Sequence, residues 1–264
     1  MQSEELKKKA DDLRNDGKTQ EAIALYKQLF NQADSAGRVD LAGHALQMIG
    51  VCWHMENNWD EASKSLEKAS EFYLEHDDKK GAGNTLRDLG IAAMSAQKLD
   101  DARLYYQQAI KQLQADFPAE YGITLAKIGL LNLYEGNINE AKHAIADSIL
   151  VLESAGNWFF LSTALIHLAA VHAQQEEYRG ALIALDRAEA LYNEHTDEPN
   201  TRRFAQIWGG QAYCYAELHE LEKAHELFHK AIEVITREHY PVEATAELLR
   251  DIRADKTIQK LMQV

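Results

Sequence analysis

The sequence predicts an all-α protein in which six helix hairpins stack as an α-solenoid and a further helix caps the C-terminal end. Three observations favour this fold class. Apolar residues recur at helical spacing, the pattern repeats about every 40 residues, and strand-like alternation of apolar and polar residues is absent. The three prolines, Pro118, Pro199 and Pro241, fall between or after the predicted helix pairs, where no backbone N–H is needed.

Residues 83–109 show the repeating unit. Each half places apolar and small residues on one helical stripe, at spacings of three, four and seven residues. The two stripes consist of Leu86, Leu89, Gly90 and Ala93, and of Ala102, Tyr106 and Ala109. A short polar break at residues 97–100 separates them, and Asp100 is expected to cap the second helix. The unit is therefore two antiparallel amphipathic helices, with small residues where the backbones come close.

An alanine that opens each second helix marks the register of the repeats. These alanines are Ala22, Ala62, Ala102, Ala141, Ala181 and Ala224, at intervals of 40, 40, 39, 40 and 43 residues. Small residues lie twelve positions before them, at Ala10, Gly50, Gly90, Gly129, Ala169 and Ala212. Large apolar residues lie four positions after them, at Tyr26, Leu66, Tyr106, Ile145, Leu185 and Phe228. A register kept over six copies is strong support for a repeat array.

This pattern resembles the tetratricopeptide repeat (TPR) in its longer form of about 40 residues, as found in kinesin light chains, Pins-type polarity adaptors and bacterial peptide-pheromone receptors. The resemblance covers about residues 3–235. It implies a right-handed α-solenoid that forms one superhelical domain over residues 1–264. The expected repeats are residues 3–36, 43–76, 83–116, 122–155, 162–195 and 205–238, and the expected cap is residues 243–264.

Composition and charge restrict the classes of partner. The net charge of −14 disfavours a nucleic-acid partner and favours one that is apolar or basic in part, although the same charge also serves solubility alone. The charged N-terminus lacks the apolar core of a signal peptide, and the most apolar run, residues 158–173, is too short and polar to span a membrane. Cys52 and Cys214 lie four repeats apart, so two free thiols and a cytoplasmic location are expected.

The resemblance implies a non-enzymatic scaffold that binds a protein or peptide in the concave groove of the superhelix. In such repeats, six positions of each first helix face this groove. The candidate groove residues are His44, Gln47, Val51, Met55, Asn84, Arg87, Ile91, Met94, Lys127, Leu130, Tyr134, Ile166, His167 and Tyr213. The apolar members are expected to form a continuous exposed strip, which is typical of binding sites. The alternatives are that curvature buries part of this strip or that a second copy covers it in a homodimer.

Two other functions remain open. One is a bacterial peptide-sensing regulator of the TPR receptor type without a DNA-binding domain, since none fits before Leu6. The other is a zinc-dependent hydrolase, because His225, Glu226 and His229 match the H-E-x-x-H motif. The repeat register also explains that motif, since both histidines fall at outward polar positions beside the core residue Phe228. The sequence therefore predicts no catalytic residues, no metal and no cofactor.

Overall fold

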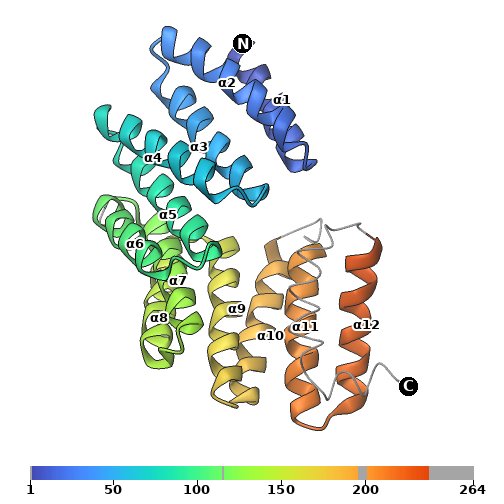
Figure 1. The fold of residues 1–264 in the computed structure, drawn as a ribbon. Helices are drawn as coiled ribbons and strands as arrows, with labels where there is room; N and C mark the ends of the chain where they lie inside the picture. The colour runs from blue at the N-terminus through green and yellow to red at the C-terminus, as the bar shows by residue number, and fades with distance from the viewer. Residues whose placement is uncertain (1, 115, 196–200, 238–264) are drawn as a thin grey trace. The chain divides into compact units, whose positions relative to one another are not determined.

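The computed structural model describes residues 2–114, 116–195 and 201–237, which form twelve α-helices and no strand (Figure 1). The predicted all-α helical-repeat fold is confirmed. In chain order the helices are α1 (Gln2–Asn15), α2 (Thr19–Ser35), α3 (Val39–Met55), α4 (Trp59–Glu75), α5 (Lys79–Ser95), α6 (Leu99–Leu113), α7 (Pro118–Tyr134), α8 (Ile138–Ser154), α9 (Trp158–Gln174), α10 (Tyr178–His195), α11 (Thr201–Glu217) and α12 (Leu221–Arg237). The predicted cap at residues 243–264 lies outside the described residues.

The chain divides into two compact units, Met1–Leu131 and Asn132–Val264. The N-terminal unit contains α1–α6 and most of α7, and the second unit contains the end of α7 and α8–α12. Among the described residues, none of the helices combines the length and apolar character needed to cross a bilayer.

Helix and turn lengths explain the repeat period. Two 17-residue helices, such as α3 and α4, and two three-residue turns make one 40-residue unit. Nine of the turns reverse the chain through one residue with positive φ, the conformation that commonly ends a helix. These residues are Gly17, Gly37, Asn57, Asp77, Gln97, Gly136, Gly156, Glu176 and His219, with φ between 56° and 80°. Most of them are 20 residues apart, so turns within and between hairpins share one geometry.

Helix starts differ from the sequence-based expectation. From the second repeat on, each first helix begins four residues before the expected start of its repeat. The expectation that Asp100 caps α6 is wrong, because α6 begins at Leu99 and its N-cap is Lys98. Asp100 instead lies in the first turn, where a carboxylate is stabilised by the helix dipole. Pro118 is the first residue of α7, a position that suits its missing N–H.

The core follows the predicted register. All six marker alanines are at most 1% exposed. The small residues twelve positions earlier lie where the two helices of a hairpin approach closely. A Cβ atom on Gly90, for example, would come within 2.3 Å of Cε1 of Tyr106. In the N-terminal unit, buried residues of α1–α3 form one cluster, and residues of α4–α7 form two more.

The second unit has a more aromatic interior. Trp158 of α9 packs edge-on against Tyr192 of α10, with ring centroids 5.6 Å apart. Phe204 of α11 packs against the same tyrosine at 5.8 Å. Trp208 donates a hydrogen bond from Nε1 to Glu189 at 2.9 Å. These contacts join α9, α10 and α11 within this unit.

Candidate partner-binding wall and pocket

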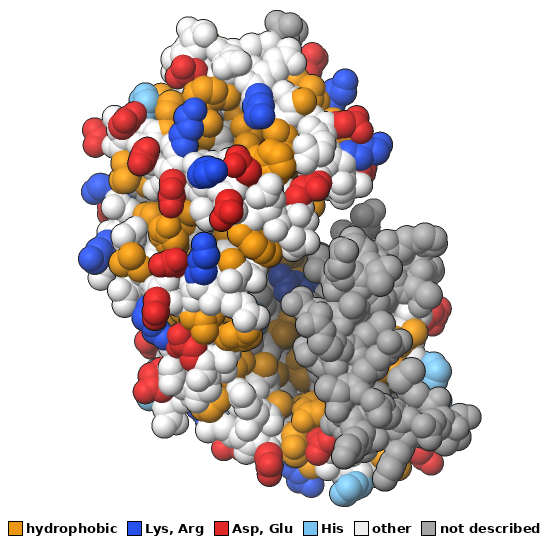
Figure 2. Space-filling model, viewed as in Figure 1, with side chains coloured by type: hydrophobic (Ala, Val, Ile, Leu, Met, Phe, Trp, Pro, Cys, Tyr) orange, Lys and Arg blue, Asp and Glu red, His pale blue; other side chains and the backbone are white. Residues whose placement is uncertain are grey.

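The first helices of consecutive hairpins form a layer in the N-terminal unit. Helix α3 contacts α1 on one side and α5 on the other. We call this layer of α1, α3 and α5 the first-helix wall. Figure 2 shows acidic and basic side chains interspersed with hydrophobic ones on the visible face of the N-terminal helices.

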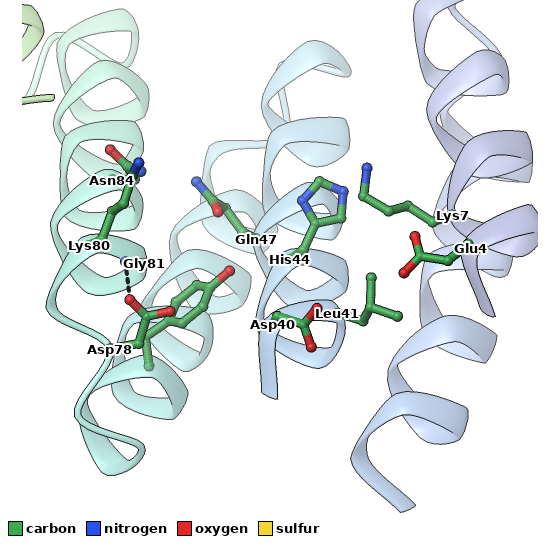
Figure 3. A pocket seen from close by; sticks show the side chains of 11 residues that line it. Glu4, Lys7, Asp40, Leu41, His44, Gln47, Asp78, Lys80, Gly81 and Asn84 are labelled. Carbon is green, nitrogen blue, oxygen red and sulfur yellow. Dashed lines mark hydrogen bonds between the residues drawn. The ribbon is translucent and has the colours of Figure 1, made fainter. Parts of the chain in front are cut away.

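A pocket of about 450 Å³ opens between the three helices of the wall (Figure 3). Its lining is mostly polar and comes chiefly from the N-terminal halves of these helices. The lining residues are Glu4, Lys7, Asp40, Leu41, His44, Gln47, Tyr73, Asp78, Lys80, Gly81 and Asn84. In Figure 3, Lys7 and Glu4 of α1 face His44 and Gln47 of α3, with Lys80 and Asn84 of α5 on the far side.

Two glycines admit the ring of Tyr73, which reaches the pocket from α4. A Cβ atom on Gly43 of α3 or on Gly81 of α5 would lie 2.3 Å from a ring carbon of Tyr73. Real Cβ atoms essentially never make such contacts, so only glycine allows the ring to sit between the two helices. Burial raises the pKa of Tyr73, and the nearby carboxylates of Asp78 and Asp40 raise it further. The phenol is therefore neutral, and it lines the pocket together with both carboxylates.

Ion pairs occupy most of the charges around the pocket. Lys7 Nζ lies 2.8 Å from Asp11 Oδ2, and Lys80 Nζ lies 2.5 Å from Glu120 Oε1. Arg38 Nη2 lies 3.1 Å from both Glu4 Oε1 and Asp40 Oδ2. Such partly exposed pairs fix side-chain positions more than they add stability.

Asp78 of the pocket caps helix α5. Its Oδ1 accepts a hydrogen bond from the Gly81 N–H at 2.8 Å. Asn58 and Asn157 make the equivalent cap on α4 and α9, accepting from Glu61 N and Phe160 N. The cap at this position therefore needs a side-chain oxygen but not a negative charge.

A polar network continues behind the pocket. Gln47 Nε2 donates to Asp88 Oδ2 at 2.7 Å, and Arg87 Nη1 donates to Asn84 Oδ1 at 2.8 Å. Burial raises the pKa of Asp88, although Arg87 and the hydrogen bond from Gln47 oppose this effect. The network holds the two amide side chains of the pocket, Gln47 and Asn84, in place.

A second carboxylate, that of Asp11, holds side chains in place on the α1 side of the pocket. Burial alone would raise the pKa of Asp11, but hydrogen bonds from Lys7 and Tyr26 outweigh that effect and lower it. The Tyr26 hydroxyl donates to Asp11 Oδ1 at 2.5 Å, and His44 Nε2 lies 3.5 Å from the same oxygen. Burial lowers the pKa of His44, so its ring is neutral near pH 7.

The structure places the predicted groove residues of the N-terminal unit along α3, α5 and α7. His44, Gln47 and Asn84 line the pocket. The apolar members of the expected strip differ in exposure within this unit. Met55 is 46% exposed, but Ile91 and Met94 are half-buried because they pack against the cluster that contains Tyr106. The remaining residues of the prediction in this unit, which are also half-buried, are Val51, Arg87, Lys127 and Leu130.

The other predicted residues belong to the second unit. Tyr134 is 56% exposed, whereas Ile166 and His167 of α9 are half-buried. Tyr213 of α11 is half-buried and packs edge-on against Tyr178, with ring centroids 6.0 Å apart.

Sequence reasoning missed several pocket residues. Asp40, Asp78 and Lys80 precede the expected repeat starts, and Tyr73 belongs to a second helix. Because each first helix begins one turn earlier than expected, Asp40, Asp78 and Lys80 belong to the first-helix wall or to its N-cap. The acidic N-cap residue Asp78, three residues before Gly81, was the signal that could have located this turn.

The H-E-x-x-H segment forms an exposed histidine pair on α12. His225 Nε2 and His229 Nε2 lie 3.0 Å apart, and Glu226 pairs with Lys230 at 2.8 Å. The described residues bring no group of three or more potential metal ligands together. A zinc site of this type also needs a third ligand, and Glu243 and Glu247, which follow the motif in sequence, lie outside the described residues.

Both cysteines are buried free thiols, Cys52 in the N-terminal unit and Cys214 in the second. Burial raises the pKa of Cys52 to about 11 and that of Cys214 to about 12. A thiol that stays protonated is a poor nucleophile. These residues therefore fit a packing role.

Similarity to known proteins was found in the three-dimensional structure and not in the sequence. No family model and no curated protein matches the sequence. The structure of BtubC (BKLC) from P. vanneervenii is similar, with a TM-score of 0.72 at 12% identity over 84% of this chain and 94% of that chain. A Rap protein complexed with competence and sporulation factor gives 0.65 at 14% identity, over 97% of this chain and 74% of that chain.

A third similar structure contains TPR-like repeats from Podosopora anserina. Its TM-score is 0.58 at 12% identity, over 74% of this chain and 95% of that chain. At sequence identities this low, structural similarity supports a shared fold and no further property. Together with the helix hairpins in constant register, they show that this chain has the helical-repeat fold of TPR-type proteins.

Proposed function

We propose that the chain is a non-enzymatic scaffold that binds an extended segment of a protein or peptide on the first-helix wall. The observation that carries this proposal is the pocket between α1, α3 and α5, in which Gln47 and Asn84 are held by hydrogen bonds. An amide side chain has both a donor and an acceptor, so it can pair with a peptide backbone. Groups held in place beforehand cost less ordering entropy when a ligand binds.

The neighbouring side chains support the same function. Met55 at the end of α3 is 46% exposed, and half-buried Ile91 and Met94 lie on α5. Methionine adapts its shape to varied apolar partners. A segment that lies along the wall would meet polar groups at the pocket and apolar groups toward the C-terminal ends of α3 and α5.

The test compares two matched double variants of the full chain. A partner that co-purifies with the chain is identified by mass spectrometry, purified, and titrated calorimetrically against each variant. Met55→Glu with Asn84→Ala changes the wall, and Leu104→Glu with Gln107→Ala makes the same kinds of change on exposed positions of α6. We expect the wall variant to bind at least tenfold more weakly and the α6 variant to bind within twofold of the unmodified chain. Equal affinity for all three proteins would overturn the proposal.

A peptide-sensing regulator is the second candidate, and the similarity to a Rap protein complexed with competence and sporulation factor favours it. A regulator of this kind would bind a free short peptide rather than a segment of a larger protein. Free peptide at 100 times its Kd would stabilise the fold by about 2.7 kcal/mol and raise Tm. Thermal unfolding with synthetic peptides from the partner segment distinguishes the two candidates. Sedimentation over a range of concentrations tests whether a homodimer covers the wall instead.

A further inference from the structure

The charge balance of the pocket is acidic. Five carboxylates line it or pair with its lining, from Glu4, Asp11, Asp40, Asp78 and Glu120. Three cations do so, from Lys7, Arg38 and Lys80. The lining side chains alone comprise three carboxylates and two lysines, so with His44 neutral the lining has a net charge of about −1 near pH 7.

The two lysines of the lining are turned to carboxylates outside it. Lys7 is held by Asp11 at 2.8 Å. Lys80 is held by Glu120 at 2.5 Å, and its ammonium lies 6.0 Å from the ring centroid of Phe117. Neither lysine is therefore available at low cost to a carboxylate or phosphate of a ligand. This arrangement disfavours an anionic group in the pocket.

Asp78 provides an acceptor for a cation. Its Oδ1 is used by the helix cap, which leaves Oδ2 for a second donor. Tyr73 lines the same pocket as Asp78 and Asp40, and a neutral phenol oxygen also accepts hydrogen bonds. Leu41, which also lines the pocket, is only 4% exposed and offers an alkyl stem a small apolar contact beside Asp40.

We propose that this pocket receives the ammonium or guanidinium group of a lysine or arginine side chain in the bound segment, with Asp78 as its main acceptor and Asp40 and Tyr73 beside it. The inference rests on the proposed function and assigns the specificity of its pocket. An acidic or purely apolar side chain at the same place would leave Asp78 without a counter-charge, whereas Glu4 and Asp40 already pair with Arg38.

The test begins with a peptide library displayed on phage and selected on the full chain. Peptides that bind more weakly to the Met55→Glu and Asn84→Ala double variant are assigned to the wall. We expect nearly all of these peptides to contain a lysine or arginine at one fixed position. Replacing that residue with norleucine, which keeps the alkyl stem, should weaken binding about fivefold in calorimetric titration. The difference should shrink as salt is added.

The decisive variant is Asp78→Asn. Asparagine already caps α4 and α9 through Asn58 and Asn157, so the substitution keeps the cap and removes only the charge. Asp78→Asn should reduce the preference for the basic peptide over its norleucine form to less than twofold. Asp101→Asn, an exposed position on α6, should leave that preference unchanged.

The outcomes separate this inference from the proposed function. Wall-binding peptides whose affinity is the same with norleucine, or whose preference survives Asp78→Asn, would overturn the basic-side-chain inference and leave the wall as the binding site. Selected peptides that bind the wall variant as well as the unmodified chain would overturn both. A preference for a free peptide N-terminus over the acetylated form, with no basic side chain, would also contradict the inference.

Discussion

Gln47 on α3 donates a hydrogen bond to Asp88 on α5 at 2.7 Å, which links two first helices across 41 residues of sequence. Gln47 also lines the pocket, whereas Asp88 is buried and is not one of the lining residues. The position of a pocket amide is thus fixed by a carboxylate that burial makes costly to ionise. Stability and pocket geometry are coupled at this pair.

Asp88→Asn should stabilise the protein at neutral pH. Because burial raises the folded-state pKa of Asp88 above its usual 3.8, the folded chain keeps this proton at pH values where the unfolded chain has lost it. Its contribution to stability therefore falls as pH rises from about 3.8 through the raised pKa. Asparagine keeps an acceptor for Gln47 without the charge, so we expect a gain of about 1 kcal/mol at pH 7.

Urea unfolding of both proteins at several pH values checks this prediction. The gain should be present at pH 7 and should vanish toward pH 3.8. An asparagine variant that is less stable at pH 7, or a gain that is independent of pH, would show that the ionised carboxylate is favourable in the fold.

Tyr26 and Tyr106 occupy the same repeat position and should respond differently to the same change. The Tyr26 hydroxyl donates to Asp11 at 2.5 Å, whereas the buried Tyr106 hydroxyl has no hydrogen-bond partner among the described residues. Tyr26→Phe should therefore cost about 1.5–2 kcal/mol, because a buried bond to a charged group is lost. Tyr106→Phe should be neutral or slightly stabilising. Chemical denaturation measures both, and equal costs would contradict the assigned bonding.

Gly81→Ala should disturb the pocket through Tyr73. The added Cβ would lie 2.3 Å from the ring of Tyr73, so the ring or a helix must move, at a cost of about 1–3 kcal/mol. Because the clash is specific, the alanine should cost much less when Tyr73→Leu is already present. A double-mutant cycle of unfolding free energies measures this coupling. Additive effects of the two substitutions would mean that the ring of Tyr73 is not the reason why position 81 requires glycine.

Gln97→Gly should stabilise the N-terminal unit by about 0.5 kcal/mol. Gln97 has φ 59°, which costs a residue with a side chain about 1 kcal/mol, whereas Gly17 and Gly37 occupy equivalent turns without that cost. The greater freedom of glycine in the unfolded chain offsets part of the gain. Thermal unfolding should show a higher Tm for Gln97→Gly, and a lower one would contradict the shared turn geometry.

Much of the fold could be predicted from the sequence because the repeat register carries it. Ala102 and Tyr106 are fully buried as their spacing indicated, since hairpin packing repeats with the same period as the residues. Asp100 was misplaced as a cap because acidic residues are favoured both at the N-cap and in the first turn of a helix.

The site was less predictable, for physical reasons. Tyr73 reaches the pocket only because it fits between Gly43 and Gly81, which come from two neighbouring first helices. No periodicity within one repeat encodes that contact. Likewise, the half-burial of Ile91 and Met94 depends on how they pack against the cluster around Tyr106. Predictions of exposure that rest on register alone miss such packing.

Site-specific photo-crosslinking tests the binding wall most directly. A photoreactive benzoylphenylalanine is introduced in place of Asn84 on the wall or of Leu104, which is 51% exposed on α6, and each protein is irradiated with its purified partner. We predict that a single extended segment of the partner crosslinks to position 84 and that position 104 gives none. Crosslinking at position 104 without any at position 84 would contradict the first-helix wall as the binding site.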